Sequence, residues 1–508
     1  MAEPKVTTSK GTLRGTEQAG VAAFKGIPFG APPTGERRFR PPQPGEAWDG
    51  VRDATAYGPI CPQMFFPADG PLSALAHVEP TDEDCLFLNV TTPDPGAGGL
   101  PVMVWIHGGG FSSGSGSHRL YESAALAGEG VVVVTLNYRL HALGFLYLDE
   151  LFVGAEGTGN LGILDQIAAL RWVQEDIAAF GGDPGNVTIF GESAGGMSVG
   201  TLLGTRAARG LFHRAIPQSG AGHHNLSAGA ATRVARKLLE AVGVEPGDWD
   251  ALLSVSAPEL INAQLAMAMP GSPALVEMLG DEATTKKMAF EPVVDGITRD
   301  KLPIEAIRGG EASDVDVLIG CNSDEWRLMH YAIPEAVRGM AGPPDVNKLF
   351  AGSSMSGEDV LATYKRTTGG DDEDVNLALE TDMMFAAPAR QLADAQVRHN
   401  PNVFRYRFSW RTPVADGVLG SCHALELPFV FGNLDVPALL GDAPPAELSA
   451  AMRKAWTSFA ASGDPNTDGL PSWPRHDPDA KQLMDFGTSV QVIDDPDAER
   501  LALWEGVL

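Results

Sequence analysis

One stretch of this chain constrains its fold more than any other: residues 186–196, which read Asn-Val-Thr-Ile-Phe-Gly-Glu-Ser-Ala-Gly-Gly. Val187 to Phe190 is a short β-branched and aromatic run that follows a turn-forming Gly-Gly-Asp-Pro-Gly segment, so it predicts a buried strand. The next five residues have the G-x-S-x-G pattern of a sharp strand-to-helix turn that holds a serine hydroxyl clear of the backbone. We therefore expect Ser193 to be a nucleophile.

The pattern alone is weak evidence. In a chain of 508 residues with 59 glycines, G-x-S-x-G arises by chance in roughly a third of cases. It occurs three times, around Ser112, Ser193 and Ser198. Ser112 lies in a glycine-rich loop, and Ser198 would fall inside the helix that Ser193 starts. Only Ser193 has a strand directly before it and a helix directly after it, as the turn requires.

Length and charge narrow the class of protein. A chain of 508 residues with 44% hydrophobic and 20% charged residues has ample core for a globular protein. A net charge of −28 disfavours nucleic acid and anionic membranes as partners. The N-terminus has no apolar segment and no run of about 18 apolar residues occurs, so we expect no secretory signal, no transmembrane helix and a cytoplasmic location.

Alternating strands and helices predict an α/β protein built on a large, mostly parallel central sheet with helices on both faces. A helix is expected over 160–180, capped by Asn160, and a closing helix over 448–462. We expect one domain over 1–508, with helical insertions at about 228–279 and 334–396 that form a lid. Strands are expected at 84–91, 101–107, 131–139, 215–218, 316–320 and 403–410, after an antiparallel start at 7–14 and 21–26.

A serine nucleophile requires a base and an acid, and in this fold class the chain order is serine, acid, histidine. Four histidines come late enough: His330, expected in a helix, His399, in a polar turn, His476, in a surface loop, and His423. His423 stands in a loop shortly after the predicted strand 403–410, so we choose it as the base.

The acid is expected just past the strand 314–320, because catalytic groups gather at the carboxyl ends of parallel strands. Glu325 is at this place, and its neighbour Asp324 is an alternative that position does not exclude. Glu192, beside the serine, is a further candidate for stabilising a charged His423 or positioning water. It is equally consistent with a buried structural acid.

An oxyanion that develops during acyl transfer needs backbone N–H donors. Residues 105–111, Trp-Ile-His-Gly-Gly-Gly-Phe, follow a predicted strand and have the HGGG type of loop. We expect Gly109, Gly110 and Ala194 to supply the donors. The loop lacks the G-x-x-x-x-G-K-[ST] pattern, which disfavours phosphate binding.

Metal and disulfide frameworks are not expected. The four cysteines, Cys61, Cys85, Cys321 and Cys422, are too few and too scattered for a disulfide scaffold or a zinc cluster. His223 and His224 lack the H-E-x-x-H spacing. We expect free thiols and no metal or cofactor.

These residues resemble the type-B carboxylesterase family of α/β-hydrolases over nearly the whole chain. The likeness rests on the elbow, the HGGGF loop, Glu83-Asp-Cys-Leu-Phe-Leu-Asn-Val90 and His423-Ala-Leu-Glu-Leu-Pro-Phe-Val-Phe-Gly432. It implies a triad of Ser193, Glu325 and His423, and it favours Glu325 over Asp324. Cys61 and Cys85 match a disulfide that is common in secreted members.

The resemblance also bears on specificity. The family usually has glycine where this chain has Trp326 and His141, and the aromatic residue that binds choline has no counterpart before Cys85. The family pattern implies a site lined by four apolar side chains, those of Phe65, Phe66, Phe111 and Met384. An apolar lining favours uncharged esters.

The leading hypothesis is a serine carboxylesterase that acts on small-molecule esters through an acyl-enzyme, as a monomer or weak homo-oligomer. A hydrolase of the same fold specialised for carbamate, aryl amide or polyester bonds is the first alternative. A catalytically dead adhesion or scaffold protein is a minor alternative, because such members typically lose a triad residue.

Overall fold

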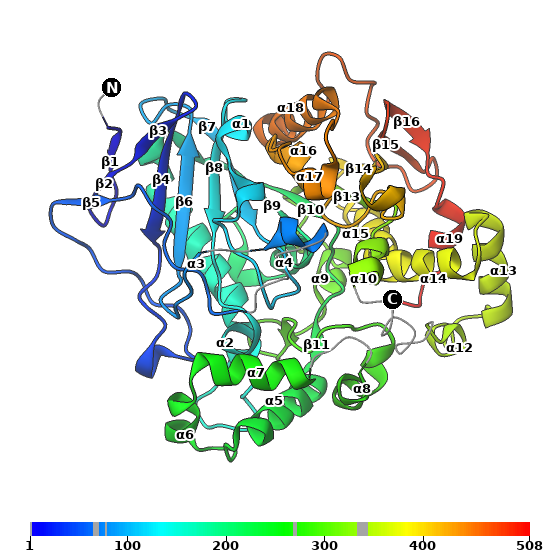
Figure 1. The fold of residues 1–508 in the computed structure, drawn as a ribbon, viewed down its shortest axis with the longest axis horizontal. Helices are drawn as coiled ribbons and strands as arrows, with labels where there is room; N and C mark the ends of the chain where they lie inside the picture. Colours follow the sequence, from blue (N-terminus) through cyan, green and yellow to red (C-terminus); the bar gives the residue numbers. More distant parts are fainter. Residues whose placement is uncertain (1–2, 64–70, 77–78, 268–271, 333–343) are drawn as a thin grey trace.

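A sheet of eleven strands runs through the centre of the protein (Figure 1). We describe a computed structural model, in which residues 3–63, 71–76, 79–267, 272–332 and 344–508 are described. From β8 to β15 all neighbouring strands are parallel, which confirms the predicted α/β fold. The strand order is β16 (Val490–Asp494), β15 (Gln482–Phe486), β14 (Val403–Phe408), β13 (Asp316–Asn322), β10 (Arg214–Gln218), β9 (Gly182–Glu192), β7 (Leu100–Ile106), β8 (Val132–Leu136), β6 (Phe87–Thr92), β4 (Val21–Pro28) and β3 (Thr16–Gln18).

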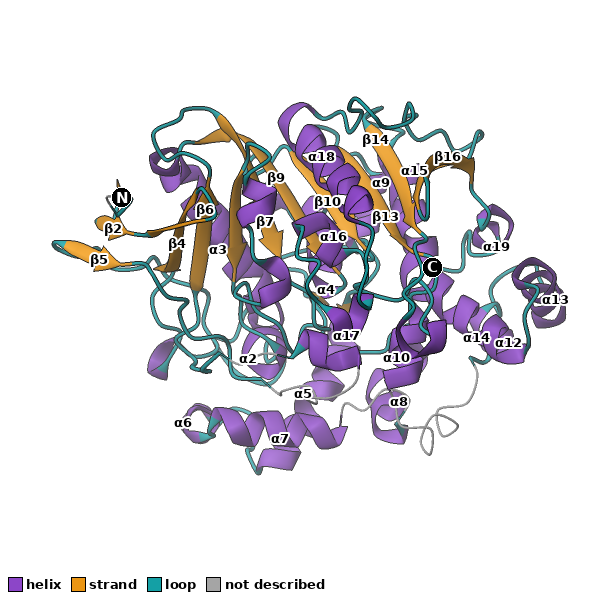
Figure 2. Cartoon of the chain, turned by 45° about the horizontal axis from the view of Figure 1, so that its top comes forward, coloured by secondary structure: helices purple, strands orange, loops and turns teal. Residues whose placement is uncertain are grey.

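Both faces of the sheet are covered by helices. Alternate residues of each strand point to opposite faces, so each strand contributes side chains to two cores. Val104 and Ile106 of β7 belong to the core that includes α3 (Leu161–Asp176) and α4 (Ala194–Leu203). Met103 and Trp105 belong to the core of the other face. Figure 2 shows the helices of that second core, α16 (Leu427–Phe431) and α18 (Ala446–Ser462), lying over the sheet.

Two groups of helices extend beyond the sheet (Figure 1). The first comprises α5 (Ala228–Val242), α6 (Trp249–Ser254), α7 (Ala257–Met267) and α8 (Pro273–Leu279). The second comprises α10 (Trp326–Ala332), α12 (Val346–Leu349), α13 (Gly357–Thr368), α14 (Asp372–Thr381) and the π-helix η8 (Asp382–Ala386), which leads into α15 (Ala387–Gln396), a helix that packs against β13 and β14. The shorter helices α1 (Ala124–Ala127), α2 (His141–Phe145), α9 (Pro303–Arg308), α17 (Pro437–Leu440) and α19 (Ala498–Ala502) complete the set of α-helices in the described ranges.

The predicted strand over 7–14 is wrong. The chain forms two short strands there, β1 (Lys5–Thr7) and β2 (Thr12–Arg14), which pair with each other. Thr8 closes the turn between them, since its N–H and its hydroxyl both donate to Gly11 O. With β5 (Val51–Asp53) they form a separate small sheet.

Asn160 stands before α3 as predicted, but its side chain does not cap the helix. Its Nδ2 donates to Val293 O at 2.9 Å and to Asp295 Oδ2 at 2.8 Å, and its Oδ1 accepts from Val293 N at 3.0 Å. The Asn160 side chain therefore bonds to a distant segment of the chain instead of capping the helix, as the local pattern had predicted. The helix also ends earlier than predicted, at Asp176, and a 3₁₀ turn continues to Phe180.

Membrane-spanning segments were searched for among the described helices, and none combines the necessary length with sufficient apolar character.

Candidate active site

Ser193 stands at the sharp turn between β9, which ends at Glu192, and α4, which begins at Ala194. Its backbone has φ +58° and ψ −126°, a conformation that residues other than glycine rarely adopt. The Ser193 N–H donates to Gln218 O of β10 at 3.0 Å, which ties the turn to the neighbouring strand. A Cβ atom at Gly195 would lie 2.0 Å from Ile106 O, so only glycine allows α4 to approach β7 this closely.

The carboxyl ends of β13 and β14 bring Glu325 and His423 together. Glu325 is fully buried, and its Oε2 lies 2.5 Å from Nδ1 of His423. Its Oε1 accepts from Asn322 N–H at 2.7 Å and from the Ser219 hydroxyl at 2.5 Å. These contacts fix the carboxylate and, through it, the orientation of the imidazole ring.

The other candidates lie elsewhere. Asp324 points away from His423, and its Oδ2 accepts from the Ser421 N–H at 2.9 Å. His330 lies in α10, and His399 is exposed with its Nε2 2.9 Å from Arg308 O. His476 lies in a loop with exposed neighbours, as predicted, but its own side chain is buried, with Nε2 2.6 Å from Oδ1 of Asp394 in α15.

Glu192 lies against the far side of the His423 ring, with its Oε1 3.1 Å from Nε2. Burial raises the pKa of Glu192 to about 8, although the neighbouring imidazole favours its charged form. Burial alone lowers the pKa of His423, but the carboxylates of Glu192 and Glu325 outweigh it and raise the pKa to about 9. At this distance the two groups titrate as a pair rather than separately.

The contacts of the described residues include no hydrogen bond to Nε2 of His423, neither from Ser193 nor from Glu192. The HGGG loop lies directly against Ser193: a Cβ at Gly108 would lie 3.0 Å from Ser193 Cβ and 2.7 Å from Glu192 O. Gly109 has φ +107°, and a Cβ there would lie 2.2 Å from Ser113 O. Ala194 is the first residue of α4, so its N–H has no partner within the helix.

The predicted apolar lining is described only in part. Phe65 and Phe66 lie outside the described residues. Phe111 is fully buried, and its ring packs edge-on against Phe145 at 5.0 Å, within the core. Met384 is buried in the π-helix η8.

Sequence reasoning missed three residues that contact the site. Ser219 binds Glu325, as described above. Phe385 of η8 packs its ring on His423, with centroids 4.8 Å apart and planes 33° apart. Glu426 is fully buried and accepts from Gln218 Nε2 at 3.1 Å and Asn322 Nδ2 at 2.8 Å. Burial, together with Glu325, raises the pKa of Glu426 to about 7.

The sequence position of Glu426, three residues after His423 on a short turn, could have indicated that its side chain lies near His423. Nothing local marks Phe385. A π-helix often occurs at a functional site, but its presence is not readable from these residues.

The four cysteines are free, as expected. The disulfide that the resemblance implied between Cys61 and Cys85 is not formed, although each thiol is in hydrogen-bond contact with the other. His141 also contacts Cys61. Among the described residues, no group of three or more His, Cys, Asp or Glu side chains is arranged to hold a metal ion.

Comparison with known proteins agrees with this geometry. The sequence profile of the Carboxylesterase family matches residues 2–504. Para-nitrobenzyl esterase of Bacillus subtilis is 40% identical over 504 residues, which is 97% of each chain. Phenmedipham hydrolase of Pseudarthrobacter oxydans is 34% identical over 95% of each chain.

A solved structure of the Geobacillus stearothermophilus carboxylesterase EST55 superposes with a TM-score of 0.85 at 41% identity, covering 98% of this chain and 99% of that one. The α/β-hydrolase fold that the resemblance implied is therefore confirmed. The chain belongs to the carboxylesterase family and is a carboxylic ester hydrolase.

Proposed function

We propose that the protein hydrolyses uncharged, small-molecule carboxylic esters through an acyl-enzyme, with Ser193 as nucleophile, His423 as base and Glu325 as the acid that orients the base. The observation that carries the proposal is the 2.5 Å contact between Glu325 Oε2 and His423 Nδ1. A buried carboxylate at this place holds the ring in the tautomer whose Nε2 accepts a proton.

In the proposed reaction, Nε2 of His423 takes the hydroxyl proton of Ser193 while Oγ bonds to the ester carbonyl carbon. The tetrahedral intermediate collapses when the C–O bond to the alcohol breaks, and the alcohol leaves with the proton from His423. A water molecule then attacks the acyl-enzyme by the same route and releases the acid. The N–H groups of Gly109, Gly110 and Ala194 are the proposed donors to the oxyanion.

Two apolar side chains near the proposed site support an uncharged substrate. Met288 lies over the oxyanion loop, since its Sδ would be 3.5 Å from a Cβ placed at Gly110. Phe385 covers one face of His423. We expect neutral butyrate esters to be turned over with a higher kcat/KM than the corresponding choline ester, and a preference for the choline ester would contradict this part of the proposal.

The nucleophile is tested by Ser193→Ala with p-nitrophenyl acetate. We expect kcat to fall by about 10⁴-fold or more, because Ser193 forms the covalent intermediate. Ser112→Ala is the matched control, since Ser112 has the same G-x-S-x-G pattern but lies in a loop. Circular dichroism should show both variants folded. Undiminished turnover by Ser193→Ala would reject the assignment.

We also propose a cytoplasmic location. Two free thiols in contact, at Cys61 and Cys85, support a reducing compartment, because such a pair oxidises readily elsewhere.

A further inference from the structure

A polar cavity lies behind the loop that carries Glu325. Its volume is about 350 Å³, within the range of small-molecule sites. Its walls come from β14 and the residues that follow β13 and β14, from helices α10, α13 and α14, and from α19 with the chain just before it. Ser193, Glu325 and His423 are not among its lining residues, so it is separate from the proposed catalytic centre.

The lining is rich in charge. Four guanidinium groups and three carboxylates line the cavity, and two further carboxylates, Asp382 and Asp485, pair with Arg500 and Arg407 from outside the lining. The groups are Arg327, Arg407, Arg411 and Arg500 against Asp324, Asp374 and Asp497.

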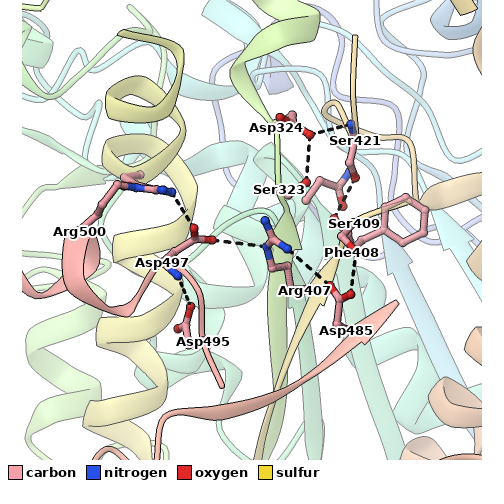
Figure 3. Close-up of polar contacts among 12 residues, drawn as sticks. Ser323, Asp324, Arg407, Phe408, Ser409, Ser421, Asp485, Asp495, Asp497 and Arg500 are labelled. Atoms are coloured by element: carbon pink, nitrogen blue, oxygen red, sulfur yellow. Dashed lines mark hydrogen bonds and ion pairs between the residues drawn. The ribbon is translucent and has the colours of Figure 1, made fainter. Parts of the chain in front are cut away.

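The aspartates already have partners in the walls of the cavity. Oδ2 of Asp324 accepts from Ser421 N–H at 2.9 Å, from the Ser323 hydroxyl at 3.0 Å and from Arg411 Nη1 at 3.0 Å. Asp497 lies between Arg500 and Arg407 (Figure 3), with Oδ1 2.8 Å from Arg500 Nη2. Asp374 pairs with Arg327. Each of the three carboxylates therefore already has a cationic partner.

Arg500 and Arg327 each have two or more partners, whereas Arg407 is the least fully used of the four arginines. Its two ion pairs are long, 3.4 Å from Nε to Asp497 and 3.7 Å from Nη1 to Asp485 (Figure 3). Its buried Nε has no hydrogen-bond partner among the described residues. A guanidinium has five N–H donors, so most of those on Arg407 remain for a ligand.

Arg411 adds donors at the edge of the cavity. Its side chain is 55% exposed, and Nη1 is the nitrogen that it uses on Asp324. The threonine hydroxyls at the other side of the cavity do not compete as donors, because Thr367 and Thr368 both donate to carbonyls of their own helix. The unsatisfied groups in the cavity are thus guanidinium donors rather than acceptors.

We propose that this cavity is a second binding site, which takes a small oxyanion through Arg407 and Arg411. The planar fork of a guanidinium matches the two oxygens of a carboxylate or phosphate group, which is the ligand chemistry that the free donors select. The site touches the catalytic loops from behind, since Asp324 precedes Glu325 and Ser421 lies two residues before His423.

The test is isothermal titration calorimetry of the whole protein with inorganic phosphate and, separately, with succinate, at constant ionic strength set by potassium chloride. We expect saturable one-to-one binding of at least one anion, accompanied by a rise in Tm. The two titrations distinguish a phosphate site from a carboxylate site. No substrate is present, so the result is independent of the proposed catalytic triad.

Arg407→Gln and Arg411→Gln should each weaken this binding by about tenfold or more, the effect of losing a charge-assisted hydrogen bond. Arg398→Gln is the matched control, because Arg398 is exposed and does not line the cavity. The half-exposed Arg411 tolerates substitution, so its variant tests the proposal even where Arg407→Gln lowers Tm. Absence of heat and of a Tm shift with both anions would overturn the proposal, and so would unchanged binding in Arg411→Gln.

Discussion

Two buried clusters of charged groups in this enzyme differ in how their charges balance. Arg139 and Asp165 form a matched pair: Arg139 donates from Nε and Nη2 to the two carboxylate oxygens at 2.8 Å each, and its backbone N–H adds a bond of 3.0 Å. Around His423 three carboxylates, those of Glu192, Glu325 and Glu426, surround one imidazole, and all four groups are buried.

This difference is the one expected between a structural ion pair and the proton-transfer site that we propose at His423. In the Arg139–Asp165 pair each charge has a counter-charge and hydrogen bonds to it. In the His423 cluster the charges cannot balance, and burial displaces the pKa values of Glu192 and Glu426 upward while the carboxylates raise that of His423. Groups with displaced pKa values in one place are typical of catalytic centres.

The largest expected effect is on the His423 cluster. Glu325→Gln should lower kcat for p-nitrophenyl acetate by about 10⁴-fold, close to 5.5 kcal/mol, because an amide no longer stabilises the imidazolium that forms in the reaction. Asp324→Asn is the control for its neighbour, and we expect it to lose less than about tenfold. If kcat falls more in Asp324→Asn than in Glu325→Gln, Asp324 rather than Glu325 is the acid.

For the matched pair the expected effect is on stability. Asp165→Asn leaves the buried Arg139 without its counter-charge and should lower the free energy of unfolding by roughly 3–5 kcal/mol, measured as a lower urea midpoint. Activity per folded molecule should not change. Glu240→Gln, which breaks the exposed pair with Lys237, is the control and should leave the midpoint where it was. An unchanged midpoint in Asp165→Asn would show that the pair is not needed.

These two clusters also show how far the sequence alone reaches. The turn at Ser193 and the strands before Glu325 and His423 were predictable, because each is encoded by consecutive residues. Position left the choice between Asp324 and Glu325 open, since adjacent side chains point in different directions, and only the resemblance to the carboxylesterase family favoured Glu325. The structure has Glu325 at His423 and Asp324 at Ser421.

Contacts between distant segments account for most of what was missed. Phe385 reaches His423 from a π-helix, and Ser219 reaches Glu325 across 106 positions of sequence. The paired strands β15 and β16 were missed for a different reason. The outer one, β16, is the edge of the sheet and none of its five side chains is fully buried, so it lacks the continuous apolar run that marked the central strands.

The next effect is on pH dependence. A base acts only when neutral, so with His423 as the proposed base we expect activity to fall as pH drops through the pKa of His423. Glu192→Gln removes one of the carboxylates that raise this pKa, and we expect the acidic limb of the kcat/KM profile to move to lower pH by about one unit, or 1.4 kcal/mol.

The control for this shift is Glu373→Gln. Glu373 also faces a histidine, with Oε2 3.5 Å from Nε2 of His330, but this pair lies outside the cluster. Its profile should coincide with that of the parent enzyme. A limb that stays in place in Glu192→Gln would mean that Glu192 is protonated throughout the range and holds no charge next to the base.

The smallest effect concerns a neutral neighbour of the cluster. Phe385→Leu removes the ring that packs on His423 at 4.8 Å, and an aromatic pair of this kind is worth roughly 0.5–1.5 kcal/mol. We expect kcat to fall about two- to tenfold with little change in KM, because the ring positions the base and leaves substrate binding to other groups. Phe350→Leu, which removes a comparable buried ring from its contact with Trp504 at 4.9 Å, should lower stability without changing kcat. Equal kcat in both variants would mean that the carboxylates hold His423 in place without help from the ring, and that charge alone distinguishes this cluster from the Arg139–Asp165 pair.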